Sequence, residues 1–291
     1  MNRMALQLLM LTIVTTASAQ EMATTVKSSE VVPGIYMIEG ADGFAGGNMA
    51  LIVGEEHVVL IDDGIPPVGP SLMNEADELA GRPIDFVINT HVHGDHVGSN
   101  ASFAENGSIV VAHDNIRKRL VEKPEDAGGP AGLPIVTFSD AVTFHLDGLE
   151  TRLFHVAAAH TDGDGVIYFP DVNVIHTGDL HFNYLFPFID LENGGSVDGY
   201  IAGQQRILAM ANDDTTIIPG HGPLARKADL QAALDMLIDG KARVQKLVAA
   251  GMSQEEVRAA NPLADYHEQW NWYFITTERM TDTLYRSLSG N

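Results

Sequence analysis

The chain has 291 residues, 45% of them hydrophobic, and a formal net charge of −22 at pH 7. This balance is typical of a globular protein, and the negative charge excludes the basic surface that binds a nucleic-acid backbone. The sequence contains no cysteine. Disulfides and thiolate metal ligands are therefore excluded, and stability has to come from a hydrophobic core and from bound metal.

The first 20 residues differ in character from the rest. Arg3 gives a positive start, residues 5–14 are apolar, and residues 17–19 (Ala-Ser-Ala) match the small-x-small pattern of a cleavage site. We predict a signal peptide over 1–19 and a mature chain over 20–291 that is periplasmic or secreted. An amphipathic membrane anchor is the alternative. Because no later segment is long and apolar enough to cross a bilayer, we predict no stable membrane insertion after the signal is removed.

The first half of the mature chain predicts strands interspersed with helices. Short β-branched and aromatic runs bounded by Gly, Pro or turn residues indicate strands. Longer stretches that Asp caps or Gly terminates indicate helices. A glycine-rich loop over 40–47 joins the first two strands as a hairpin. The predicted strands are 34–39, 48–53, 57–62, 84–90 and 109–112, and the predicted helices are 70–80, 97–105 and 114–122.

The second half follows a loop at 123–134 that is rich in Pro and Gly. Its predicted elements are strands at 135–138, 141–146, 151–156, 165–169 and 172–176, a helix at 198–211, a strand at 215–218, and mostly helix from 224 onward. Each half therefore resembles the other in the order of its elements. Two sheets packed face to face, with helices outside, would bury these apolar runs. We predict an α/β fold, a four-layer α/β/β/α sandwich, in a single domain over 20–291.

Three histidines and an aspartate lie within six residues, from His91 to His96, directly after the predicted strand 84–90. Side chains placed where a rigid strand ends are well positioned for function. Imidazole and carboxylate groups are ligands of zinc. One tetrahedral zinc with an open position uses fewer ligands than this cluster offers. The cluster therefore indicates two metal ions.

Three further candidate ligands follow strands later in the chain. These are His160, Asp179 and His221, and each lies beside glycine or another small residue. Side chains in loops at one rim of a rigid scaffold can meet in a single site. The placement of these three residues therefore indicates a site to which both halves contribute.

The spacing His-x-His-x-Asp-His over 91–96, with the three later ligands in order, resembles the metallo-β-lactamase fold superfamily, and specifically its dizinc hydrolases. The resemblance covers nearly all of the mature chain and implies the same four-layer fold. The cofactors that it implies are two Zn²⁺ ions, with iron or manganese as alternatives for these nitrogen and oxygen donors. The implied ligands are His91, His93 and His160 for one metal, Asp95, His96 and His221 for the second, and Asp179 as the bridge between them.

The chemistry of such a site agrees with the resemblance. Bound metal lowers the pKa of water to roughly 7, which supplies a bridging hydroxide as nucleophile. The ions also polarise a carbonyl and stabilise the oxyanion. Asp95 is predicted to be catalytic as well as a ligand, because it can orient the hydroxide. Asp62 and Asp63 follow a strand and are read either as partners that orient ligand histidines or as loop caps. The other histidines are read as surface or core residues.

Three residues are candidates for substrate contact. Phe44 lies in the glycine-rich loop and could act as a mobile flap, against the alternative of a passive turn. Asn183 or Tyr184 could donate a hydrogen bond to a carbonyl oxygen, against the alternative of plain loop packing. The segment 179–190 is expected to form part of the pocket wall. The C-terminal Trp and Tyr residues could pack internally or against a partner, so the oligomeric state stays open.

The complete ligand set resembles the glyoxalase II and lactonase branches of the family. Asp179 stands where one β-lactamase subclass has cysteine, and no lysine follows shortly after it. The secretion signal favours the β-lactamase branch instead, because glyoxalase substrates are cytosolic. These two lines of evidence point to different substrates, and the resemblance alone does not choose between them.

We predict a periplasmic zinc-dependent hydrolase that cleaves the C–N or C–O bond of a cyclic amide or ester through the metal-bridging hydroxide. The substrate is of the β-lactam or lactone type, and β-lactamase activity, where present, is weak. The first alternative is a glyoxalase II-like thioesterase. The alternative of another class is a non-catalytic periplasmic metal-binding accessory protein. The expected partner is a small-molecule substrate and not a nucleic acid.

Overall fold

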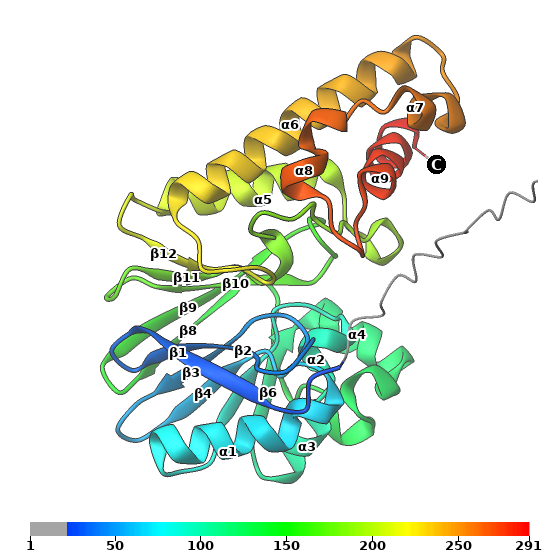
Figure 1. Ribbon diagram of the computed structural model, residues 1–291. Helices are drawn as coiled ribbons and strands as arrows, with labels where there is room; N and C mark the ends of the chain where they lie inside the picture. The colour runs from blue at the N-terminus through cyan, green and yellow to red at the C-terminus, as the bar shows by residue number, and fades with distance from the viewer. Residues whose placement is uncertain (1–21, 291) are drawn as a thin grey trace, which may run out of the picture.

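The computed structural model describes residues 22–290, which form two β-sheets packed face to face with helices on both outer sides (Figure 1). The predicted α/β/β/α sandwich is confirmed. The signal peptide predicted over 1–19 lies outside the described residues. None of the helices in the described part of the chain is long and apolar enough to cross a membrane.

The first sheet has its seven strands in chain order. They are β1 (Val26–Val32), β2 (Ile35–Gly40), β3 (Met49–Val53), β4 (Val58–Ile61), β5 (Phe86–Ile88), β6 (Ile109–His113) and β7 (Val136–Phe138). Strands β1 to β4 pair antiparallel and β4 to β7 pair parallel. Strand β1 was not predicted, because this edge strand is polar, has only one buried residue and carries little apolar alternation.

The helices of this half are α1 (Gly69–Ala80), α2 (Gly94–Val97), α3 (Asn100–Glu105) and α4 (Asp114–Glu122). The predicted helix 97–105 is split into α2 and α3. The split occurs because the Gly98 N–H donates to the carbonyl of Gly64 at 3.1 Å instead of continuing the helix. The predicted loop 123–134 contains two short 3₁₀ turns, η2 (Pro124–Ala127) and η3 (Pro130–Gly132).

The second sheet has the strand order β12-β11-β10-β9-β8. Its strands are β8 (Ala141–Leu146), β9 (Leu149–Val156), β10 (Asp164–Phe169), β11 (Val174–His176) and β12 (Thr216–Ile218). Only β11 and β12 pair parallel. The helices of this half are α5 (Val197–Met210), α6 (Lys227–Ala249), α7 (Gln254–Ala260), α8 (His267–Trp270) and α9 (Thr277–Ser289). In Figure 1, α5 and α6 lie over the outer face of this sheet.

The core between the sheets is built from strand residues of both halves. Ile61 and Ile88 from the first sheet and Ile167 and Ile218 from the second belong to one cluster, and all four are almost fully buried. Strand β4 is buried on both faces, which explains its unbroken apolar sequence. The core fixes the ends of these strands relative to one another, and the predicted ligands follow those ends.

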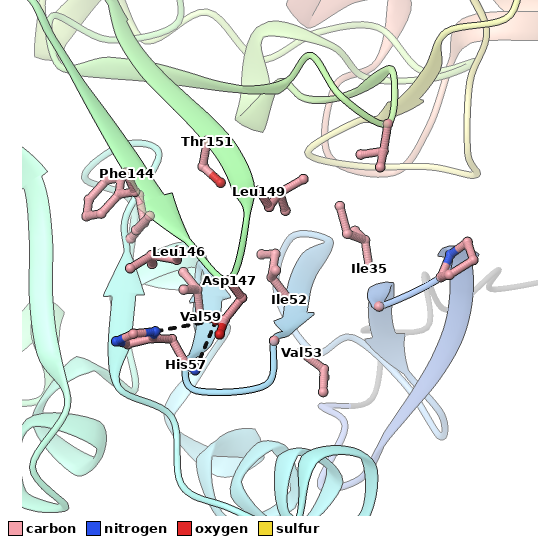
Figure 2. Close-up of a pocket in the computed structure, with 15 residues that line it drawn as sticks. Ile35, Ile52, Val53, His57, Val59, Phe144, Leu146, Asp147, Leu149 and Thr151 are labelled. Atoms are coloured by element: carbon pink, nitrogen blue, oxygen red, sulfur yellow. Dashed lines mark hydrogen bonds and ion pairs between the residues drawn. The ribbon is translucent and has the colours of Figure 1, made fainter.

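A cavity of about 170 Å³ lies between the sheets where the β3–β4 and β8–β9 turns meet (Figure 2). Its walls are mainly apolar and include Ile52, Phe144 and Leu149. The Asp147 carboxylate accepts the backbone N–H groups of Glu56 at 2.6 Å and His57 at 3.1 Å, which ties the two turns together. None of the predicted metal ligands lines this cavity.

Tyr200 of α5 provides a test of the packing against the second sheet. The residue is fully buried, and its hydroxyl has no hydrogen-bond partner among the described residues. An unpaired buried hydroxyl costs about 1–3 kcal/mol. Tyr200→Phe is therefore expected to leave the melting temperature unchanged or to raise it, as measured by calorimetry. Tyr200→Leu should lower it through lost packing. A clear fall in Tyr200→Phe would show that the hydroxyl has a partner after all.

Candidate metal centre

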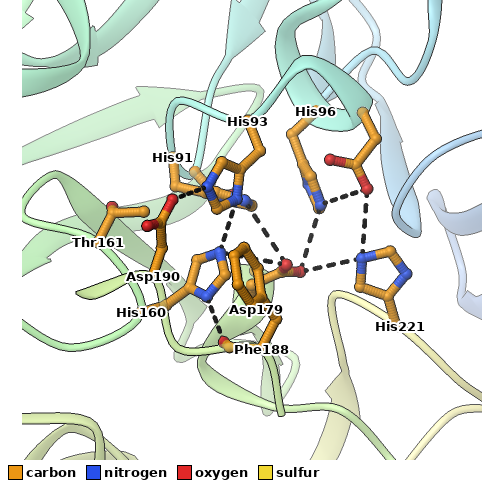
Figure 3. A network of polar contacts seen from close by, with 12 residues as sticks. His91, His93, His96, His160, Thr161, Asp179, Phe188, Asp190 and His221 are labelled. Atoms are coloured by element: carbon orange, nitrogen blue, oxygen red, sulfur yellow. Dashed lines mark hydrogen bonds and ion pairs between the residues drawn. The ribbon is translucent and has the colours of Figure 1, made fainter. Parts of the chain in front are cut away.

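All seven predicted ligands meet at one edge of the sandwich (Figure 3). Strand β5 leads into the 91–96 motif, where α2 turns the chain so that its side chains face the second sheet. His160 lies between β9 and β10, Asp179 in the 3₁₀ turn η4 (Gly178–Leu180) after β11, and His221 after β12. Both halves of the fold therefore supply ligands.

The first cluster consists of His91, His93, His160 and Asp179, whose donor atoms all lie within 4.8 Å of one another. His160 Nε2 is 2.9 Å from His93 Nδ1 and 3.3 Å from Asp179 Oδ2. His91 Nε2 is 3.6 Å from the same oxygen. Three imidazole nitrogens and one carboxylate oxygen directed into one small volume form a donor set that suits zinc.

The second cluster consists of Asp95, His96 and His221. Asp95 Oδ2 lies 3.6 Å from His96 Nε2 and 3.4 Å from His221 Nε2. The same two nitrogens lie 3.3 Å and 3.4 Å from Asp179 Oδ1. The two oxygens of Asp179 thus face different clusters, with Oδ2 toward the first and Oδ1 toward the second.

The residues of both clusters fit divalent metal ions. His91 Nε2, His96 Nε2 and Asp179 Oδ1 are buried and have no hydrogen-bond partner among the described residues. Leaving such atoms unpaired costs about 1–3 kcal/mol each, and a metal ion in each cluster would satisfy all three. These three atoms therefore have the arrangement of metal ligands and are not part of a hydrogen-bonded network.

The electrostatics keep these groups in the forms that bind metal. Burial lowers the pKa of His160 to about 4, so this imidazole is neutral near pH 7. Burial acts to raise the pKa of Asp95, but His96 and His221 outweigh it and lower the value to about 2. For His221, burial is outweighed by Asp179 and Asp95, which raise its pKa to about 9. In the second cluster a metal ion therefore has to displace a proton.

Four of the ligand histidines are oriented by a hydrogen-bond acceptor. In each of them, one ring nitrogen faces its cluster and the other donates to that acceptor. The His96 Nδ1–H donates to Asp62 Oδ2 at 2.7 Å, and the His91 Nδ1–H to Thr90 Oγ1 at 3.0 Å. The further pairs are His93 Nε2–H to Asp190 Oδ2 at 2.8 Å and His160 Nδ1–H to the Phe188 carbonyl at 2.7 Å. Such partners fix the ring orientation and raise the basicity of the ligand nitrogen.

Asp62 and Asp63 have one each of the two roles considered for them. Asp62 orients His96, and it also accepts the Thr90 hydroxyl at 2.7 Å. Asp63 is a cap, since its Oδ1 accepts the Ser99 N–H at 2.8 Å. Asp190 gave no signal in the sequence, because it lies 97 residues from His93 along the chain.

Asp62→Asn is expected to weaken metal binding by about 10–100-fold, because the amide cannot accept from both His96 and Thr90 with the strength of a carboxylate. Asparagine tolerates the left-handed backbone at this position, where φ is 56°. The measurement is a zinc titration against a chromophoric chelator. Asp63→Asn is the matched control and should bind as the parent does. Equal affinities for all three proteins would contradict the orienting role.

The glycine-rich loop contacts the second cluster closely. A Cβ on Gly47 would lie 2.0 Å from His96 Cε1. The Gly47 N–H donates to the Asp95 carbonyl at 3.0 Å. The ring of Phe44 in this loop stacks on that of His221, with centroids 6.3 Å apart and planes 6° apart.

A cavity of about 360 Å³ opens onto the clusters. Phe44, a candidate for substrate contact, lines it. The segment 179–190 contributes Phe182 and Phe188, which confirms the predicted pocket wall. Residues 272–274, between α8 and α9, also line the cavity, and no pattern in the sequence predicted this. The complete lining is Phe44, His93, Asp95, Asp179, Phe182, Phe188, His221, Trp272, Tyr273 and Phe274.

Asn183 and Tyr184 do not line this cavity, which corrects their place as candidate substrate contacts. The buried Asn183 amide donates to the carbonyls of Pro223 at 3.0 Å and Leu224 at 3.3 Å. The Tyr184 hydroxyl donates to Asp229 at 2.7 Å. The chain turns at Tyr184, where φ is 60°, and this turn directs both side chains toward the segment that precedes α6 and its first turn.

Comparison with known proteins agrees with this geometry. The family model of the Metallo-beta-lactamase superfamily matches residues 42–221. A metallo-beta-lactamase from Pontibacter korlensis has the same fold, with a TM-score of 0.66 and 19% identity over 74% of this chain and 100% of that one.

Relatives that align in sequence include the following three. The 2,4-dinitroanisole O-demethylase subunit alpha of Nocardioides sp. is 25% identical, over 58% of this chain and 51% of the relative. A hydroxyacylglutathione hydrolase of Polaromonas sp. is 31% identical, over 55% and 59%. The type 2 metallo-beta-lactamase of Bacteroides fragilis is 21% identical, over 62% and 70%. The matches thus span about half to three fifths of the first two relatives. With its motifs, its fold and the family match over most of its length, the chain belongs to the metallo-beta-lactamase superfamily.

Proposed function

We propose that this protein is a metal-dependent hydrolase that uses two divalent ions, zinc in the first place, to cleave a cyclic ester or amide. The placement of Asp179 is the observation that carries the proposal. Its Oδ2 faces His91 and His160, and its Oδ1 faces His96 and His221. A carboxylate shared in this way suits a two-metal hydrolase, since it would fix both ions relative to each other.

When bound, the ions would supply an activated water near neutral pH and would polarise the substrate carbonyl. The chain's own contribution is to hold and orient the reacting groups. Asp95 lines the cavity and is held ionised, so it can orient the attacking water by accepting a hydrogen bond from it. Water adds to the carbonyl carbon, the C–O or C–N bond breaks, and the leaving oxygen or nitrogen takes up the proton.

The names of the relatives do not decide the substrate. One is named for a thioester of glutathione, one for β-lactams and one for 2,4-dinitroanisole. The second candidate function is a thioesterase, which the identity of 31% with a hydroxyacylglutathione hydrolase favours. We place the protein in the periplasm or outside the cell on the pattern of residues 1–19 alone.

The test is a metal assay joined to a hydrolysis panel of nitrocefin, a penicillin, an acyl-homoserine lactone and a glutathione thioester. The expected result is two ions per chain and fastest turnover of a cyclic substrate. Fastest turnover of the thioester would replace the proposal with the second candidate. Full metal content without turnover of any substrate would favour the accessory protein. In His93→Ala, the loss of all activity at full metal content would contradict the ligand assignment.

A further inference from the structure

The wall of the active-site cavity is aromatic and rigid. The Trp272 ring lies 6.1 Å from that of Phe182 and 5.5 Å from that of Phe274, measured between centroids. Phe274 in turn meets Phe188 edge to face at 5.4 Å. The Trp272 Nε1–H donates to the Phe186 carbonyl at 2.9 Å, which fixes the indole plane. Interlocked rings of this kind offer a preformed apolar surface to a ligand.

The mouth of the cavity leaves large apolar side chains in water. Tyr273 is 64% exposed and Phe274 is 39% exposed. Both belong to the segment 272–274 that joins α8 to α9. An exposed apolar patch beside a cavity marks a binding surface, because covering it removes apolar area from water.

Among its described lining residues, the cavity has no lysine or arginine to pair with an anionic group of a substrate. The four ionisable lining residues other than tyrosine all belong to the metal clusters. The chain as a whole carries a net charge of −22. A carboxylate remote from the reacting carbonyl would lose its hydration against aromatic rings and gain no counter-charge.

Arg279 is the cation to consider at this wall. Its guanidinium lies 4.3 Å from the centroid of Phe274 and 5.2 Å from that of Phe188, and Nη1 donates to the Phe274 carbonyl at 2.9 Å. Its charge is therefore engaged by two ring faces and a carbonyl. Arg279 supports the aromatic wall and does not line the cavity.

We propose that the substrate is an uncharged ester or lactone with an apolar aryl or acyl group, which packs on the wall formed by Phe182, Phe188, Trp272 and Phe274. This inference rests on the proposed hydrolase function and narrows it. Substrates that carry a carboxylate away from the scissile bond, as glutathione thioesters do, are disfavoured. Selectivity then resides in residues 272–274 and not in the metal ligands.

The experiment compares dihydrocoumarin, an uncharged aryl lactone, with the same lactone carrying a carboxylate on its aromatic ring, using the zinc-loaded protein. The expected kcat/KM is higher for the uncharged lactone by about 100-fold or more, because the other substrate must bury a carboxylate without a partner. Phe274→Lys should narrow this ratio by at least about tenfold, since it places an ammonium group at the mouth. Ile238→Lys, which changes an exposed apolar residue of α6, is the charge-matched control and should leave the ratio unchanged.

A binding measurement separates this inference from the hydrolase proposal. Tetralone, a cyclic ketone that cannot be hydrolysed, is titrated while tryptophan fluorescence is followed, and its ring-carboxylated analogue serves as the comparison. Binding of tetralone alone supports the aromatic site even if no lactone is cleaved, and the hydrolase proposal would then fail by itself. Equal binding of both ketones, equal turnover of both lactones, or no binding of tetralone would overturn the inference.

Arg279 receives its own test. Arg279→Met is expected to affect both lactones to a similar degree, because the side chain stiffens a wall that both would touch. A loss confined to the carboxylated lactone would show that Arg279 anchors the carboxylate. That outcome would overturn the proposed preference for uncharged substrates.

Discussion

Replacing Asp179 with asparagine is expected to reduce metal content from two ions to one or none and to lower kcat/KM by about 100–1,000-fold or more. The decrease in kcat/KM follows from the loss of a negative charge at the reacting centre. Burial acts to raise the pKa of Asp179, but His221, His96 and His91 hold it well below its usual range, so the parent residue is a carboxylate at neutral pH. The amide keeps the shape of the side chain. One of its two terminal atoms becomes a donor, however, and can no longer bind a cation.

The comparison variant for Asp179→Asn is Asp190→Asn. The Asp190 carboxylate contacts His93 at 2.8 Å, and the Asp190 backbone N–H donates to the His160 carbonyl at 2.9 Å. Both contacts belong to the first cluster, so the effect of the substitution on metal affinity should be about 10–100-fold and confined to that cluster. Metal content is measured by elemental analysis after gel filtration, and activity with the best substrate of the panel. Two ions and activity within tenfold of the parent in Asp179→Asn would contradict the bridging role.

Zinc is expected to stabilise the chelator-treated protein by a large margin. Each site filled at 1,000 times its dissociation constant contributes about 4 kcal/mol. For a chain of this size that corresponds to a rise in melting temperature of the order of 10 °C per site. The physical reason is the set of buried, unpaired ligand atoms, together with the supply of ligands from both sheets. Filling the clusters joins the two halves of the fold.

The measurement is calorimetry of the metal-free protein during titration with zinc. His93→Ala and His221→Ala each remove a ligand of one cluster, so each should lose about half of the rise. Calcium and magnesium should produce little of it, because these hard cations prefer oxygen donors. A change of less than about 1 °C in the parent at saturating zinc would show that the clusters do not bind metal in the folded state.

The clustering of the candidate ligands could be predicted because the most informative part of the set is local. Four ligands lie within six residues after a strand, and local spacing is visible in a sequence. Their partners His160, Asp179 and His221 could be assigned only through the family pattern, since nothing local to them specifies which side chains they meet. The structure brings all seven together.

The substrate side of the site could not be predicted in the same way. Asn183 and Tyr184 are close to Asp179 in sequence, yet the turn at Tyr184 directs them away from the cavity. Trp272 is far from every ligand in sequence, yet its ring lies 6.2 Å from that of His221. This contact depends on how α6 to α9 pack on the second sheet. Tertiary packing of that kind leaves no periodic signal in the segment that it positions.

The close approach of Gly47 to His96 couples the loop over 40–47 to the second cluster. Any side chain at position 47 would collide with a ligand ring, so this glycine is required for its small size and not for flexibility. The loop that carries Phe44 is thereby in contact with the second cluster. Any factor by which a ligand on Phe44 changes the affinity for an ion held by His96 is also the factor by which that ion changes the affinity for the ligand, because such linkage is reciprocal. Substrate affinity and metal affinity are therefore linked, and a change in one can be measured through the other.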